Sequence, residues 1–187
     1  MMKKTDPHHG RGKIKSTARP MLDDPLDFIV EDHARERQVC ALIDRLVSMA
    51  SMKDAEMQQI LAFLEDQLPQ HLADEEIDLF PMMLERCDPE DEIKKVIDKL
   101  LADHGDPLVD APVIVAIIEG LETPNSVLSE EESRKMAEFV QHARRHLTLE
   151  NAIILPIARA RLTEADLRTM KTHMVERRRI DPTGEDR

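Results

Sequence analysis

The stretch HARRHLTLENAIILP, residues 142–156, decides how the chain is interpreted. His142, His146 and Glu150 recur at every fourth position, so that in a helix they share one face. Apolar residues such as Ile153 continue that face, which predicts that it is the buried side of the helix. Groups that bind metal ions therefore stand where the helix of an ordinary folded domain is apolar.

The composition of the chain favours an all-α fold. Its 187 residues are 41% hydrophobic but only 2% aromatic, with no Trp and no Tyr, so that aliphatic side chains and Met must form the core. Five Gly provide little material for the tight turns of an all-β fold. Helical periodicity covers five segments: residues 25–50, 53–87, 89 to beyond 104, 130–160 and, for a shorter fifth helix, 164–179.

Long helices joined by short connections are typical of an up-down-up-down four-helix bundle, here with a short C-terminal fifth helix. We expect residues 1–22 to form a basic, disordered tail, residues 23–162 the bundle, and residues 163–187 a short C-terminal helix and tail. Pro69 should kink the second helix. The run HGDPLVD with the following Pro112 predicts a break or bend in the third helix between residues 105 and 112.

Charge and cysteine content restrict the partners and the compartment. The formal net charge is −12, although residues 1–20 carry six Lys or Arg against one Asp. An acidic body repels phosphate backbones, so we expect no nucleic-acid binding by the main body. Two Cys make no disulfide framework, and no apolar run approaches the ~18 residues of a membrane span. We therefore expect a cytoplasmic protein that does not associate with membranes.

Every long helix places a histidine on its inward face, and two of these histidines are followed four residues later by a glutamate. A buried carboxylate without a partner costs several kcal/mol, and a divalent cation supplies that partner. The candidate metal ligands are His33, His71, Glu75, His104, His146 and Glu150.

The spacing within the two HxxxE pairs indicates a dinuclear site. In a helix, residues four apart lie about 6 Å apart along the axis, so an imidazole and a carboxylate of one pair can converge on one ion. The second carboxylate oxygen can then reach a neighbouring ion. Imidazole and carboxylate suit iron, and less selectively manganese, zinc or copper. The Glu-x-x-His pairs of ferritin-like di-metal sites and the His-Glu-x-x-His motif of metalloproteases are absent.

The motifs EDH, LPQHLADEEIDLFP, LADH and HLTLENAIILP together resemble the hemerythrin-like (HHE cation-binding) family, whose members share a four-helix bundle around a non-haem di-iron site. The resemblance covers about residues 24–160. It implies two iron ions as the cofactor, with manganese or zinc as alternatives. It further implies four histidine ligands and two bridging carboxylates, namely His33, His71, His104 and His146 with Glu75 and Glu150.

The chain departs from the oxygen-carrying members of that family, which place an HxxxH pair on the third helix and an HxxxxD motif on the fourth. Here the third helix has only His104, with Leu108 one turn later. The additional histidine, His142, lies about 12 Å along the helix from Glu150. His142 is therefore either a further ligand or a group that hydrogen-bonds a ligand or lines the entrance. One ligand fewer leaves an open position on a metal, which favours exogenous ligands.

Three functions are compatible with these patterns. The first is a non-haem di-iron protein that binds O2 or a related small ligand for sensing, iron handling or redox defence. The second is a di-iron enzyme that acts on peroxide or nitric oxide, so that the sequence leaves open whether the protein is an enzyme. The third is a bundle with a structural metal that serves as a protein-interaction module, its protein partner being unidentified.

Residues beside the candidate ligands have simpler interpretations. Asp74, Glu76 and Asp78 are expected on a solvated helix face. Met82 and Met83 are expected to fill the core rather than to bind a metal. Cys40 is expected to behave as a small buried hydrophobic residue.

Overall fold

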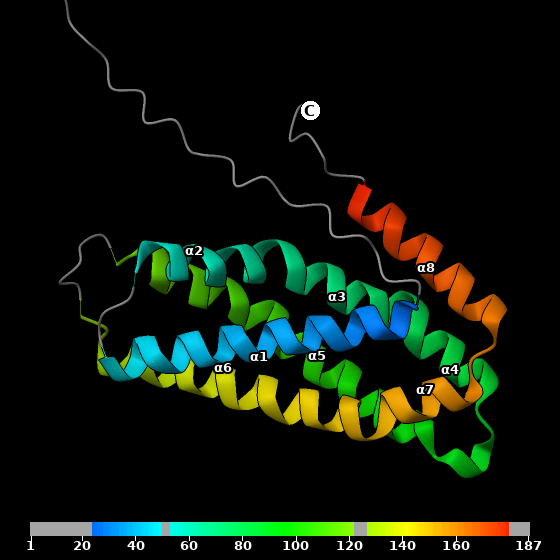
Figure 1. Cartoon of the computed structure of the whole chain (residues 1–187). Coiled ribbons are helices and arrows are strands. Elements are labelled where there is room, and N and C mark those ends of the chain that lie inside the picture. The colour runs from blue at the N-terminus through cyan, green and yellow to red at the C-terminus, as the bar shows by residue number, and fades with distance from the viewer. Residues whose placement is uncertain (1–23, 50–52, 122–126, 180–187) are drawn as a thin grey trace, which may run out of the picture.

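The computed structural model describes residues 24–49, 53–121 and 127–179 of the chain, and within them every regular element is helical (Figure 1). The all-α class is thereby confirmed. The first helix, α1, spans Pro25–Met49. A second continuous rod consists of α2 (Asp54–Ala62), the π-helical η1 (Phe63–Gln67), α3 (Leu68–Asp74), the π-helical η2 (Glu75–Leu79) and α4 (Phe80–Arg86).

The second half of the chain adds two more rods and a terminal helix. A short 3₁₀ turn, η3 (Pro89–Asp91), precedes α5 (Ile93–Glu119). The fourth rod consists of α6 (Glu130–Leu149), the π-helical η4 (Glu150–Ile154) and α7 (Leu155–Arg161). The terminal helix, α8, spans Glu164–Arg179. The four rods run side by side, and α8 packs at one end against α1 and α3 (Figure 1).

Local capping explains why α6 begins where it does. The Ser129 hydroxyl accepts a hydrogen bond from the Glu132 backbone N–H at 3.2 Å, and the Glu132 carboxylate accepts one from the Ser129 backbone N–H at 2.7 Å. This reciprocal arrangement satisfies two backbone donors that the first turn of a helix leaves without partners. At the start of α1, the Asp24 carboxylate accepts a hydrogen bond from the Leu26 N–H at 2.8 Å.

Of the break or bend expected in the third long helix, the break is wrong, because α5 runs without interruption from Ile93 to Glu119 through Pro107 and Pro112, and the bend stays a prediction. Each proline removes one backbone hydrogen bond from the helix. Beyond the prolines, however, the same helix buries Ile114, Ile117 and Ile118 in the core. Packing of this apolar face outweighs the lost hydrogen bonds, since tertiary contacts supply most of the stability of a helix in a protein.

Each of the three π-helical segments ends two residues before a proline. η1 precedes Pro69, η2 precedes Pro81 and η4 precedes Pro156. A proline ring in a regular α-helix clashes with the carbonyl four residues earlier, and a wider turn just before it relieves that clash. The distortion expected at Pro69 thus takes the form of a π turn, and the same effect recurs at two further prolines.

The core is divided into two apolar clusters, and all four rods contribute to both. The first cluster includes Ile43, Ile60, Ile114 and Phe139. The second includes Ile29, Met83, Ile97 and Ala158, together with Met170 and Met174 from α8. Cys40 is fully buried in the first cluster and Met83 in the second, as expected of residues that fill a core. Along every rod, a polar segment separates the two clusters.

Candidate metal centre

The polar segment between the two apolar clusters brings the six candidate ligands together in the middle of the molecule. Each rod contributes at least one of them, and none has more than 7% of its surface exposed. Two rods contribute one ligand each, and the other two rods contribute a histidine and a glutamate each. The six are His33 of α1, His71 of α3, Glu75 at the start of η2, His104 of α5, His146 of α6 and Glu150 at the start of η4.

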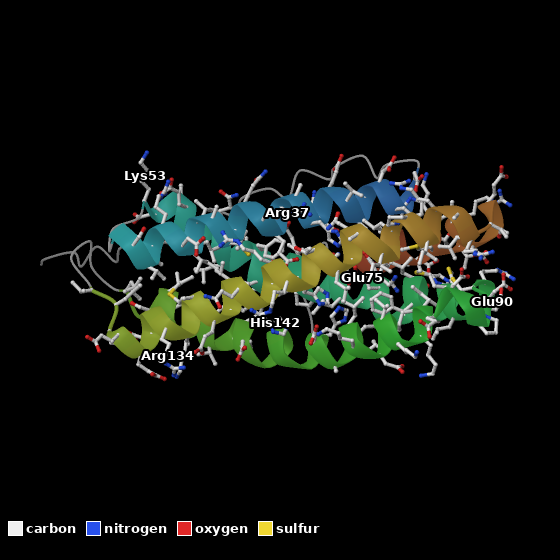
Figure 2. All side chains as sticks on the ribbon, turned by 90° about the horizontal axis from the view of Figure 1, so that it is seen from below. Arg37, Lys53, Glu75, Glu90, Arg134 and His142 are labelled. Atoms are coloured by element: carbon white, nitrogen blue, oxygen red, sulfur yellow. The ribbon has the colours of Figure 1, made fainter. Side chains whose placement is uncertain are left out.

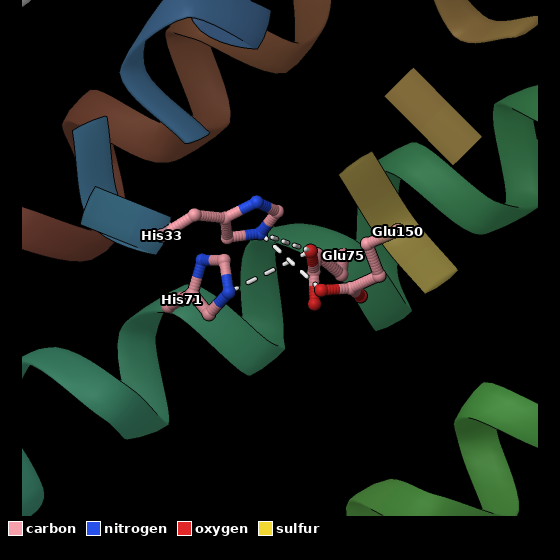
Figure 3. A group of neighbouring side chains, drawn as sticks. All are labelled: His33, His71, Glu75 and Glu150. Atoms are coloured by element: carbon pink, nitrogen blue, oxygen red, sulfur yellow. Dashed lines mark ion pairs between the residues drawn. The ribbon is translucent and has the colours of Figure 1, made fainter. Parts of the chain in front are cut away.

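A first group of ligand atoms is formed by His33, His71, Glu75 and Glu150, with all four atoms within 4.8 Å of one another (Figure 3). His33 Nε2 lies 3.3 Å from Glu150 Oε2 and 3.6 Å from Glu75 Oε1. His71 Nε2 lies 3.6 Å from Glu75 Oε1. The two imidazoles thus face the same pair of carboxylates.

A second group is formed by His104 and His146 with the same two carboxylates. His146 Nε2 lies 3.0 Å from Glu150 Oε1, and His104 Nε2 lies 3.5 Å from Glu75 Oε2. The two Nε2 atoms lie 3.0 Å from each other. Each group therefore contains two imidazoles and the two shared carboxylates, an arrangement that can hold two cations side by side.

The hydrogen bonding of these groups is incomplete. Both oxygens of Glu75, both oxygens of Glu150 and Nε2 of His33 are buried and accept or donate no hydrogen bond. Leaving a buried polar atom without a partner costs about 1–3 kcal/mol, and more for a charged group. Cations placed between the imidazoles and the carboxylates would satisfy these atoms together, so the donor set fits divalent metal ions.

The electrostatics of the candidate ligands lead to the same conclusion. Burial and the neighbouring charge of Glu150 raise the pKa of Glu75 well above its usual range. Burial opposes charge on Glu150 too, but the His146 and His33 imidazoles, whose Nε2 atoms lie 3.0 and 3.3 Å from its oxygens, hold the pKa of Glu150 well below the usual range. Burial disfavours the imidazolium form of His33, yet contacts with Glu150 and Glu75 outweigh it and raise its pKa to about 10. A proton on His33 thus supplies positive charge beside the two buried carboxylates.

Residues around the ligands orient the imidazole rings, and these residues were missed in the sequence. Glu76 Oε1 accepts a hydrogen bond from His104 Nδ1 at 2.8 Å, so Glu76 is a ligand-orienting residue rather than part of a solvated face. The Asn151 side-chain amide contacts His33 Nδ1 at 2.9 Å and donates a hydrogen bond to the Leu147 carbonyl at 2.6 Å. Such partners fix the ring orientation of metal-binding histidines. Asn151 directly follows Glu150, but nothing in the sequence shows that it reaches α1.

The expectation that Asp74 and Asp78 are solvated is wrong, because both are almost completely buried beneath α8. Arg178 Nη2 donates to Asp74 Oδ2 at 2.6 Å, and Arg177 Nε donates to Asp74 Oδ1 at 2.8 Å. Arg177 also forms an ion pair with Asp78. The docking of α8 on this face is a tertiary contact, which the periodicity of the second rod alone does not reveal.

A narrow cavity, with room for roughly one water-sized molecule, lies beside the centre. Three candidate ligands, His71, His104 and His146, contribute to its lining. The rest of the lining is mostly apolar and includes Leu68, Leu72, Phe139 and Ala143. Glu36, one turn after His33 on α1, adds a buried carboxyl group that was not singled out in the sequence.

His142 lies apart from the two groups that share the carboxylates. It is half-buried and forms a third group with Asp103 and His146. The structure therefore places His142 next to a candidate ligand, but not in the same group as Glu150.

Comparison with known proteins agrees with the motifs. The family model described as the hemerythrin HHE cation-binding domain matches residues 24–158, which is more than two thirds of the chain. No curated protein gives a significant match to the sequence. In the part of the chain that the structure describes, no helix combines the length and apolar character required to cross a lipid bilayer.

Proposed function

Because the chain belongs to the hemerythrin HHE cation-binding domain family, we propose that it is a non-haem di-iron protein. Its centre binds O2 or a related small ligand for sensing, iron handling or redox defence. The observation that carries the proposal is the sharing of Glu75 and Glu150 by two pairs of histidines. In this proposal the four rods form an up-down-up-down bundle, and α8 is a fifth helix that covers one end.

Each residue of the centre has a defined role in this proposal. His33 and His71 hold one ion, whereas His104 and His146 hold the other. Glu75 and Glu150 would bridge the pair, because each carboxylate belongs to both groups and turns one oxygen toward the histidines of each. Bound iron supplies reversible one-electron redox chemistry. Glu76 and Asn151 keep the rings of His104 and His33 in place.

The cavity supports an exogenous small ligand. Two imidazoles and two carboxylate oxygens do not fill the coordination sphere of iron, which leaves positions open. The cavity borders His71, His104 and His146, and its size admits a molecule of two or three atoms rather than a larger substrate. Its apolar lining excludes bulk water and suits a neutral, poorly hydrated ligand.

Glu36 favours an enzyme as the second candidate, acting on peroxide or nitric oxide. Burial and the nearby charge of Glu150 raise the pKa of Glu36 to about 7. A carboxyl group with such a pKa can hold or release a proton near neutral pH. Because Glu36 lines the cavity, it is placed to protonate a ligand that arrives there.

Metal analysis combined with optical spectroscopy tests the di-iron proposal. Protein produced in iron-sufficient cells should contain two irons per chain, and its ferric form should absorb in the near ultraviolet. The Glu150→Ala variant is the matched control and should lose the two-iron signature. A colourless zinc protein would contradict the proposal and would favour a structural metal.

Turnover assays separate a binding protein from an enzyme. The iron-loaded protein is mixed with excess hydrogen peroxide or nitric oxide, and consumption per centre is measured. Repeated turnover that falls in Glu36→Gln would favour the enzyme. Stoichiometric binding without turnover would favour a sensor or an iron-handling protein.

A further inference from the structure

A third group of potential metal ligands lies beside the centre, and we call its members, Asp103, His142 and His146, the outer cluster. One ligand atom from each residue lies within 4.8 Å of the others. Asp103 directly precedes His104 on α5, and His142 precedes His146 by one turn of α6. Figure 2 labels His142 on α6. The two helices that present His104 and His146 to the centre therefore present Asp103 and His142 next to it.

Two imidazole nitrogens of the outer cluster have no hydrogen-bond partner. They are Nε2 of His142 and Nδ1 of His146, and both atoms are buried. His146, which is 93% buried, already directs its other nitrogen, Nε2, to Glu150 Oε1 at 3.0 Å. One imidazole thus has one nitrogen at the centre and a second, unpartnered nitrogen available for another contact.

Exposure differs between the outer cluster and the centre. Asp103 and His142 are half-buried, whereas the six residues of the centre are buried. A cation must lose its water before it can enter the centre, and moving a bare ion through an apolar wall is very costly. Protein ligands that replace the water stepwise avoid that cost, and a metal site requires an entry path of this kind.

We propose that the outer cluster is the entry site through which divalent cations load the centre, an inference that rests on the cation-binding function proposed above. Asp103 and His142 capture a partly hydrated cation at the surface between α5 and α6. Because His146 belongs to both clusters, the captured cation is already held by one ligand of the centre. Exchange of Asp103 and His142 for His104, Glu75 and Glu150 then completes the transfer.

The ammonium group of Lys99, which contacts Asp103, does not prevent the outer cluster from binding a metal ion. Lys99 Nζ lies 3.0 Å from Asp103 Oδ2, but the Lys99 side chain is 64% exposed. Exposed pairs of this kind contribute little, so a divalent ion can displace the ammonium group. The same helix offers a matched control, since Lys94 pairs with Asp98 at the same spacing on an exposed part of α5.

Metal-loading kinetics of the full chain test the proposal. Apoprotein is mixed with Co²⁺, and the appearance of the visible bands of bound cobalt is followed by stopped flow. In Asp103→Asn and in His142→Ala we expect the loading rate to fall about tenfold or more, comparable with the 10–100-fold losses of metal affinity or activity that follow removal of residues next to metal ligands. The final content should remain two ions per chain. Asp98→Asn should load at the wild-type rate.

The outcomes separate this inference from the proposed centre. Variants that load two ions at the wild-type rate would overturn the entry site and leave the centre intact. A His142→Ala protein that loads quickly but holds only one ion would also overturn it, because His142 would then be a permanent ligand. Wild-type protein that binds no cation would overturn the centre together with its entry site.

Discussion

Glu75 and Glu150 occupy equivalent positions in two different rods: each begins a five-residue π-helical segment, and each precedes a proline by six residues. The carbonyl of Glu75 accepts a hydrogen bond from the Phe80 N–H, and that of Glu150 accepts one from the Leu155 N–H. π-helical turns are rare in proteins overall, and those that occur are frequently found at functional sites. Here each π turn begins at the residue that carries the shared carboxylate.

Pro81 and Pro156 should therefore affect metal affinity although neither belongs to the six candidate ligands. Replacing either by Ala removes the clash that favours the π turn. The carboxylate should then no longer be held in the orientation that lets it contact both pairs of histidines. We expect cation affinity to fall roughly 10–100-fold. Stability of the apoprotein should not fall, because proline inside a helix costs about 3 kcal/mol. Competition with a chelator measures affinity, and thermal melting measures stability.

The control for this prediction is Pro69→Ala, since η1 begins at the core residue Phe63 rather than at a candidate ligand. Its cation affinity should match that of the wild type. An equal loss of affinity in all three variants would show that the prolines act on the whole bundle and not on the two carboxylates.

Removal of one shared carboxylate should abolish the two-ion centre while the bundle still folds. In Glu75→Ala or Glu150→Ala, both ions lose a ligand, because each carboxylate belongs to both groups. Metal analysis of the purified variants should show fewer than two ions per chain. His33→Ala, which removes a ligand of one group alone, should retain more metal than either variant. Two ions in Glu75→Ala or Glu150→Ala would disprove bridging.

Glu36 should make the apoprotein less stable as the pH rises from about 4.5 to about 7. Burial raises its pKa to about 7, so the favourable protonated state is lost across that interval. Glu36→Gln removes the buried charge and should stabilise the apoprotein at pH above 7 by roughly 3 kcal/mol, with little gain near pH 4.5. Denaturant unfolding at several pH values measures this, with the exposed Glu65→Gln as control.

Competition between protons and cations should make stabilisation by metal increase with pH. In the apoprotein, contacts with Glu150 and Glu75 raise the pKa of His33 to about 10, although burial opposes this. The stability that this proton provides is complete below about pH 6.5 and is lost as the pH rises through about 10. Bound cations replace the proton. Calorimetry with and without a chelator should therefore show a melting-temperature difference that widens across this interval, and a constant difference would contradict the prediction.

The attachment of α8 should depend on Arg178. Its guanidinium contacts the fully buried Asp74 and lies 4.6 Å from the centre of the Phe28 ring. Arg178→Ala leaves Asp74 with only part of its charge compensated and should destabilise the protein by roughly 2–3 kcal/mol. Arg168→Ala, which breaks an exposed pair with Glu164 on the same helix, should change stability little. Equal effects in urea unfolding would contradict this assignment.

The central part of the site could be predicted from sequence because it depends on helical periodicity alone. Apolar faces at spacings of three and four predict that four histidines point inward, namely His33, His71, His104 and His146. The structure brings these four together. Their role as metal ligands remains a prediction. The two-group arrangement follows from the HxxxE spacing, which places each carboxylate one turn from its histidine.

What could not be predicted depends on contacts between distant segments. The burial of Asp74 and Asp78 requires α8 to lie on the second rod, and α8 is about 90 residues further along the chain. The continuity of α5 through Pro107 depends on the packing of Ile114 against other rods, which local proline rules do not include. The π turns at Glu75 and Glu150 do have a local signal, a proline six residues after each glutamate.

The division of the apolar core into two clusters affects how the protein opens. Neither cluster alone is the core of a complete domain, and the layer between them consists of buried imidazoles and carboxylates. Two cations would tie all four rods at that layer, so that amide hydrogens in both halves should exchange in one cooperative event. Without cations the layer is held by ion pairs such as that between protonated His33 and Glu150. The amide hydrogens of each half should then exchange with a separate free energy of opening. The metal would then determine how many cooperative units the bundle has, and not only how stable it is.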